Sequence, residues 1–400
     1  MVIPNIIIST VIVFIALYKL FTKKFDIVKP DVYISIIALV SFVLPQFALE
    51  IAVSWQSLLV FLIGYIAFLL PFSFKAKKIT KPKGYILSSY KLNPLLKIIF
   101  RLYLPLIIVI LFYSFEFRIT NLLGLPGVVP KIPYAGIIFY FLTTGIFTLI
   151  CCYFIYVKKY NKNFLLLVIM LILYSIYQSL LGWRQGAFDT IIIIVILSAC
   201  LNFKFSKLKK ITIGLILTPV IFVIIKFQNT FRGSDSNLID IWDRLFGIRY
   251  LDSIVSFFST KNDSDILFNN FFYFNLVDSN TNTADYHNHI ILGGSIDFIN
   301  GAARTGFGSV FMSFGIIGVF VCFYLLGIYY KKIYEYNFKN YTNGFINIFY
   351  GINIIILQRI LIEQLDYGVI THYIASLFFI YLIYRLFKII GLKYMYASNY

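Results

Sequence analysis

Long apolar runs separated by short polar turns make up most of this chain. Several runs approach the roughly 20 residues that an α-helix needs to cross a bilayer, and none alternates with the period of two that strands require. The pattern therefore predicts an all-α polytopic membrane protein with about eleven transmembrane helices. The expected spans are residues 3–21, 32–49, 55–74, 102–117, 135–157, 164–182, 187–203, 211–229, 305–330, 343–362 and 367–387.

One long polar stretch interrupts this pattern. Residues 231–304 are too polar to lie in a bilayer, and they lack the dense lysines of the other connections. We therefore expect helices 1–8 in residues 1–230, one large outer loop in 231–304, and helices 9–11 with a cytoplasmic tail in 305–400.

Within this loop, the apolar positions of residues 245–259 predict a helix that lies on the outer leaflet. Asp240, Asp243 and Asp252 on or near this helix are interpreted as its solvated face. Farther along, the glycines that follow Thr305 favour close helix approach in a membrane.

Composition and charge support the same topology. The chain is 60% hydrophobic and 13% charged, which excludes a soluble domain. Of the 35 Lys and Arg, 25 fall in the six segments assigned to one side, and 14 of the 17 acids fall on the other side. The positive-inside rule then places the N-terminus and the 231–304 loop outside and the C-terminus in the cytoplasm. The net charge of +18 is thus a topology signal and a contact for anionic membrane lipids, with no nucleic acid required.

Arginine dominates the cations of the predicted outer side, whereas the cytoplasmic side is mostly lysine. The planar guanidinium binds phosphate through two parallel hydrogen bonds and stays charged when partly desolvated. Each arginine taken alone is interpreted as a headgroup anchor or a partner of a nearby Asp, but the set favours a phosphate site. The seven are Arg118, Arg184, Arg232, Arg244, Arg249, Arg304 and Arg359.

Two of these arginines stand in distinctive positions. Arg184 lies in the short turn Gly182-Trp183-Arg184-Gln185-Gly186, where its guanidinium and free backbone N–H groups of the next helix can meet one anion. Arg232 opens the outer loop, with Asp235 three residues later as a group that orients or deprotonates a sugar hydroxyl. The alternatives are an interfacial Trp–Arg anchor and a helix exit with a local ion pair.

Two of the three histidines stand in Tyr286-His287-Asn288-His289. No further ligand follows at a recognised metal spacing, so we expect no metal site. His287 near a carboxylate is a candidate general base, and a polar loop histidine is the alternative. The four cysteines lie inside apolar runs, which predicts neither a disulfide framework nor a thiolate site.

As a whole, the chain resembles the bacterial polysaccharide repeat-unit polymerases of the Wzy type. The resemblance lies in the many spans, one large late outer loop, a lysine-rich inside, Arg184 in a span turn and Arg232 at the start of the loop. It includes the glycine-rich entry to the next span, Thr305-Gly306-Phe307-Gly308 and Phe314-Gly315-Ile316-Ile317-Gly318. His287-Asn288 is similar to the His-Asn pair of the related O-antigen ligases.

This resemblance implies a GT-C-like fold in the bacterial inner membrane and a metal-independent glycosyltransferase without a cofactor. The expected donor is a glycan on undecaprenyl pyrophosphate, and the acceptor is a lipid-linked repeat unit of O-antigen or capsular polysaccharide. Arg184, Arg232, Arg249 and Arg304 would bind the pyrophosphate, and Asp235 or His287 would act on the acceptor hydroxyl. A chain-length regulator and a flippase are the protein partners that the family implies.

Three other functions remain open. A ligase would transfer a finished glycan and is not separated from a polymerase by any motif here. A flippase or other transporter would need charged residues along a path through the spans, whereas the polar residues gather outside them. A non-catalytic membrane scaffold would tolerate the loss of Arg184 or Arg232.

Overall fold

The computed structural model describes six segments of the chain together with five single positions near the C-terminus. The chain divides into two compact units, of which the first contains Met1–Lys81, Asn237–Lys339 and Ile356–Ile370. Most described residues belong to this first unit, and the account below concerns it alone. The described segments are residues 3–26, 28–48, 53–74, 251–256, 305–339 and 344–362, and the single positions are 377, 378, 381, 382 and 385.

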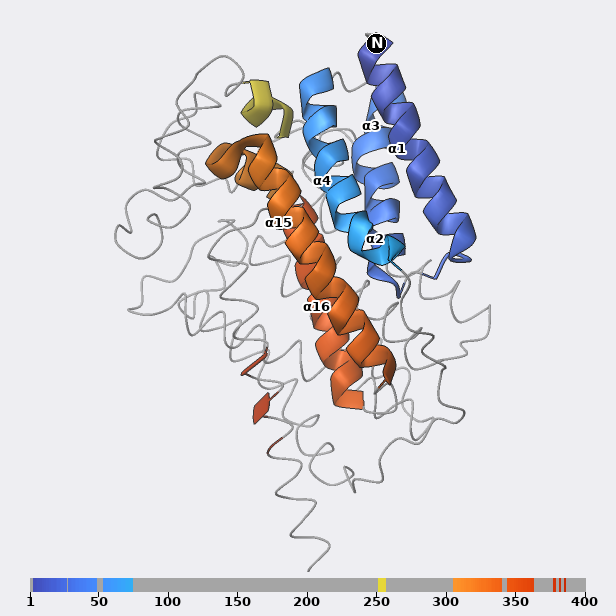
Figure 1. Ribbon diagram of the computed structural model, residues 1–400, viewed down its shortest axis with the longest axis vertical. Coiled ribbons are helices and arrows are strands. Elements are labelled where there is room, and N and C mark those ends of the chain that lie inside the picture. The colour runs from blue at the N-terminus through green and yellow to red at the C-terminus, as the bar shows by residue number, and fades with distance from the viewer. Residues whose placement is uncertain are drawn as a thin grey trace, which may run out of the picture. The chain divides into compact units, whose positions relative to one another are not determined.

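All described secondary structure is helical (Figure 1). The first, second, third and tenth expected spans are confirmed as helices, with ends within two residues of those predicted from sequence. Expected spans four to eight lie outside the described residues. The elements are α1 (Ile3–Thr22), α2 (Pro30–Ile37), the π-helix η1 (Ala38–Val43), α3 (Leu44–Ala48), α4 (Trp55–Ser73), the short helix 251–256, α15 (Gly306–Lys339) and α16 (Gly344–Ile362).

Four described helical stretches are long and apolar enough to cross a membrane. They are Ile3–Thr22, Pro30–Phe47, Trp55–Ser73 and Phe314–Lys339. The described part of the chain is therefore consistent with an all-α membrane protein.

Helix α1 carries polar, small and aliphatic residues on its inner face and bulky apolar residues on its outer face. Its buried residues are Asn5, Ser9, Ile12, Ala16 and Leu20, spaced three or four apart on one side. The opposite side exposes bulky groups such as Phe14 (72%) and Phe21 (66%). Exposure of these bulky side chains would be unfavourable in water but is favourable against lipid. The small and polar residues of the inner face pack against the neighbouring helices.

Helices α2, η1 and α3 form one continuous stretch with a wider turn in the middle. The N–H of Leu44 donates to the carbonyl of Leu39, five residues earlier, which is the π pattern. Pro45 follows directly; it lacks an N–H and its ring would crowd the carbonyl of Ser41 in a regular α-helix. The π-turn accommodates this proline without ending the helix.

Contacts at the helix ends fix the relative directions of the elements. Near the start of α1, the Asn5 side chain donates to the carbonyl of Val53, just before α4, at 2.6 Å. Ser9 Oγ donates to Gln46 Oε1 in α3 at 3.3 Å. Thus α1 and α4 run the same way, and the α2–α3 stretch returns between them, as the predicted alternation of spans requires.

Helix α15 reverses direction near its start, which the apolar pattern of the sequence did not predict. Gly315 has φ 64° and ψ −164°, a conformation that essentially only glycine adopts. The rings of Phe307 and Phe323 stack with centroids 4.0 Å apart, although 16 residues of straight helix would separate them by about 24 Å. A short arm (306–314) therefore folds back on a long arm (316–339), and the long arm extends nine residues beyond the predicted end at residue 330.

The long arm of α15 packs parallel to α4 at backbone distance. A Cβ on Gly327 would lie 2.4 Å from the carbonyl oxygen of Phe68, so only glycine allows this approach. One turn farther, Lys331 Nζ donates to the carbonyls of Pro71 (2.8 Å) and Phe74 (3.2 Å) at the end of α4. This lysine satisfies carbonyl groups that a helix C-terminus leaves without partners.

Candidate functional site

Asp252, in the described segment 251–256, makes three hydrogen bonds to the start of α4. Its Oδ1 accepts from the backbone N–H of Ser54 at 2.8 Å, from Ser54 Oγ at 2.5 Å and from Ser57 Oγ at 2.8 Å. Ser54 is also the N-cap of α4, because its Oγ accepts from the N–H of Ser57 at 3.3 Å. A carboxylate at this helix N-terminus is further favoured by the helix dipole.

The same short helix contacts the start of α15. A Cβ on Gly308 would lie 2.9 Å from Ile254 Cδ1 and 3.6 Å from Leu251 Cδ1, so the helix 251–256 lies directly over this glycine. Leu251 and Ile254 are both buried. Helix 251–256 thus joins the N-terminal end of α4 to the short arm of α15, and we call this region the polar end.

The short arm is itself firmly anchored. Thr305 has a left-handed φ of 55°, is fully buried, and its Oγ1 accepts from the N–H of Gly308 at 3.0 Å. A Cβ on Gly306 would lie 2.2 Å from the carbonyl oxygen of Ile360 in the part of α16 that belongs to the first unit. The glycines after Thr305 therefore serve close packing, as the sequence predicted.

The short arm packs against an aromatic cluster formed by Phe42, Phe61 and Phe307. Phe307 is fully buried and meets Phe61 at 4.9 Å and Phe42 at 5.9 Å between ring centroids, both edge to face. Its ring also occupies the space beside Gly64, where a Cβ would lie 2.7 Å from two ring carbons. The base of the polar end is therefore apolar and closely packed.

Two further polar pairs lie within the helix interior. Ser35 Oγ donates to the carbonyl of Asp31 at 2.7 Å and lies 2.7 Å from Tyr65 OH. Tyr33 OH donates to Gln358 Oε1 at 2.8 Å. These pairs satisfy buried hydroxyl groups between helices, a structural role that is favourable in an apolar surrounding.

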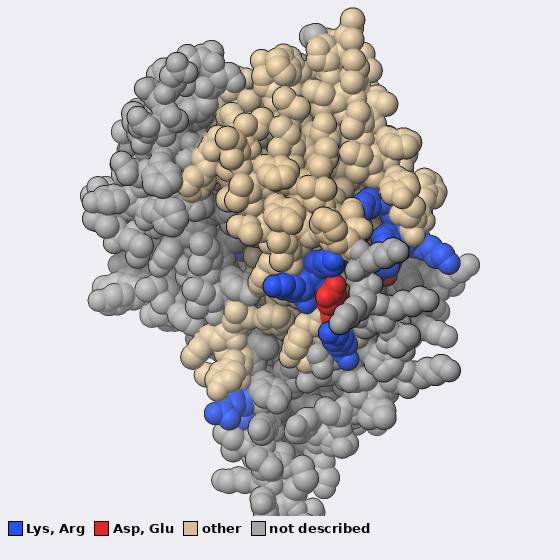
Figure 2. All heavy atoms as spheres, viewed as in Figure 1, with Lys and Arg blue, Asp and Glu red and all other residues tan. Residues whose placement is uncertain are grey.

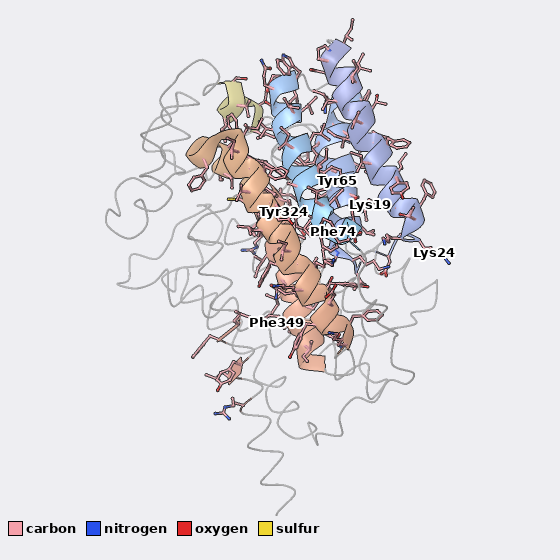
Figure 3. The ribbon with its side chains drawn as sticks, in the orientation of Figure 1. Lys19, Lys24, Tyr65, Phe74, Tyr324 and Phe349 are labelled. Atoms are coloured by element: carbon pink, nitrogen blue, oxygen red, sulfur yellow. The ribbon has the colours of Figure 1, made fainter. Side chains whose placement is uncertain are left out.

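The opposite end of the first unit is basic. Figure 2 shows basic side chains around the lower end of α1 and none on the described face above it, and Lys19 and Lys24 lie at that end (Figure 3). Lys29, Lys331 and Lys332 belong to this end as well, beside the end of α4 marked by Phe74. Among the described residues, the two ends of these helices therefore differ in charge, while the membrane topology stays a prediction.

The structure corrects one expectation for residues 251–256. Residues 251–256 are helical, as predicted for part of 245–259, but Asp252 turns toward α4 rather than forming a solvated face. Ser54 and Ser57 were missed, although a serine before an apolar run is a helix start signal. Their partner is 198 and 195 residues away, so no local pattern could reveal it.

All six residues predicted to form the site lie outside the described residues: Arg184, Arg232, Asp235, Arg249, His287 and Arg304. The structure therefore neither brings them together nor separates them. Among the residues that it does describe, no three His, Cys, Asp or Glu side chains cluster as metal ligands would.

Comparison of the chain with protein-family models, with curated proteins and with solved structures gave no match.

Proposed function

We propose that this protein is a polysaccharide repeat-unit polymerase of the bacterial inner membrane with a GT-C-like fold. The observation that carries the proposal is the attachment of helix 251–256 to the N-terminal ends of α4 and α15 through Asp252 and Gly308. A polar segment fixed at one end of apolar helices suits a substrate whose lipid lies in the bilayer and whose glycan lies outside it. The opposite, lysine-rich end suits the cytoplasmic side.

The proposed reaction joins two lipid-linked glycans at the outer surface. The growing glycan leaves undecaprenyl pyrophosphate, and a hydroxyl of the incoming repeat unit attacks its anomeric carbon. Pyrophosphate is already a good leaving group, so the protein must neutralise it and orient the acceptor. We assign the first task to Arg184, Arg232, Arg249 and Arg304.

Two of these arginines are close in sequence to described residues of the polar end. Arg304 immediately precedes the buried Thr305, and Arg249 stands three residues before Asp252. This proximity along the chain supports a role for both at the polar end. Asp235 and His287 remain the proposed groups acting on the acceptor hydroxyl.

The test is the length of surface glycan in the native host after Arg184→Ala, compared with wild type and a deletion strain. We expect the variant to yield mainly single repeat units, because a pyrophosphate contact is lost while the protein persists in the membrane. Arg385→Ala is the matched control, because this arginine stands at the end of the last expected span, on the side predicted to be cytoplasmic. This variant should retain long chains. Long chains in the deletion strain would refute the polymerase itself.

A further inference from the structure

Only one of the two carboxylate oxygens of Asp252 accepts hydrogen bonds from the described residues. All three of its described hydrogen bonds reach Oδ1, and Oδ2 has no partner among the residues that the structure describes. The side chain is only partly buried. Oδ1 therefore binds the N-terminus of α4, and Oδ2 is left for a further donor as far as the described residues extend.

A carboxylate held in this way is preorganised to accept another hydrogen bond. The two serine hydroxyls and one backbone N–H fix its position, so little side-chain freedom is lost when a ligand donates to Oδ2. An ionised carboxylate only accepts hydrogen bonds, and a sugar hydroxyl is a matching donor. Capping of α4 uses only Oδ1, so the capping role leaves Oδ2 without a function of its own.

The surroundings also fit a site that must stay rigid. The short helix that carries Asp252 is fastened by Leu251 and Ile254 to the short arm of α15. That arm is held in turn by Phe307 within the aromatic cluster. A catalytic group supported by packed elements keeps the geometry that transfer requires.

We propose that Asp252 Oδ2 binds and orients a hydroxyl of the acceptor sugar. The inference rests on the proposed polymerase function and adds a residue to its site. As the acceptor oxygen bonds to the anomeric carbon, the bond from that carbon to the pyrophosphate oxygen breaks and its electron pair leaves with pyrophosphate. The hydroxyl proton passes to Oδ2 and then to water, so Asp252 takes the proton, while Asp235 and His287 help to orient the same hydroxyl.

The decisive variant is Asp252→Asn in the full-length protein, purified into lipid nanodiscs and supplied with lipid-linked repeat units. Asparagine Oδ1 still accepts from Ser54 and Ser57, whereas an NH₂ group replaces Oδ2 and cannot accept. We expect kcat/KM for the acceptor to fall at least about a hundredfold, with a melting temperature close to that of wild type.

The complementary variant is Ser54→Ala/Ser57→Ala, which keeps both carboxylate oxygens and removes two donors to Oδ1. Its melting temperature should fall, while the folded protein retains a larger kcat/KM than Asp252→Asn. Asp31→Asn makes the same chemical change in α2, close to the lysine end, and should leave kcat/KM for the acceptor unchanged.

Two results would overturn the inference. One is wild-type kcat/KM in Asp252→Asn, and the other is an equal loss in Asp252→Asn and the double serine variant, which would make Asp252 a helix cap only. Failure of the polymerase proposal is a separate result, since wild-type protein would then form no longer glycan in the same assay.

Discussion

At the scale of single residues, glycine decides how closely the helices approach. Gly327 faces the backbone of α4 at Phe68, and Gly64 faces the ring of Phe307. Such contacts replace the hydrophobic driving force that is absent between helices in lipid. The sequence predicted close packing after Thr305, but it could not single out Gly64 or Gly327, because glycine is common in membrane helices for several reasons.

Gly327→Ala should destabilise the protein by about 1–3 kcal/mol, because the added methyl group would overlap the carbonyl oxygen of Phe68. Unfolding of the detergent-solubilised protein measures the change. Leu325→Ala on the same helix removes a side chain that is 58% exposed and is the control, with an expected change of about 0.5 kcal/mol or less. A Gly327→Ala protein as stable as wild type would mean that α4 and α15 are not this close.

At the scale of elements, the principal finding is the reversal of α15 at Gly315. The sequence predicted one span from 305 to 330, because an apolar run with several glycines has the same periodicity whether the helix continues or folds back. The stacked rings of Phe307 and Phe323 distinguish the two cases. The contact depends on residues 16 positions apart, which helical periodicity does not relate.

Gly315→Ala should cost about 1–3 kcal/mol, through backbone strain at φ 64° and ψ −164°. A clash is not expected, since no described atom lies within 4 Å of the added Cβ. Thermal unfolding of the solubilised protein would show the loss, whereas the exposed Ile317→Ala should change little. Unchanged stability in Gly315→Ala would indicate an ordinary continuous helix at this position.

At the scale of the whole molecule, hydropathy predicted the described helices well, because bilayer thickness fixes the length of a span. The distribution of lysine along the sequence predicted the basic end of the described helices, and its placement in the cytoplasm stays a prediction. The predicted site residues lie outside the described part of the chain and stay a prediction, and the contacts of Asp252 were not predicted. Asp252 meets Ser54 and Ser57 across about half the chain, and such long-range pairs leave no trace in local spacing.

We propose that this chain by itself lengthens lipid-linked glycans. The most direct measurement is the product formed when purified wild-type protein in nanodiscs receives only undecaprenyl-pyrophosphate-linked repeat units. We predict a ladder of longer glycans, with one undecaprenyl pyrophosphate released for each new glycosidic bond. Folded protein that binds these substrates but forms neither a ladder nor free undecaprenyl pyrophosphate would contradict the claim.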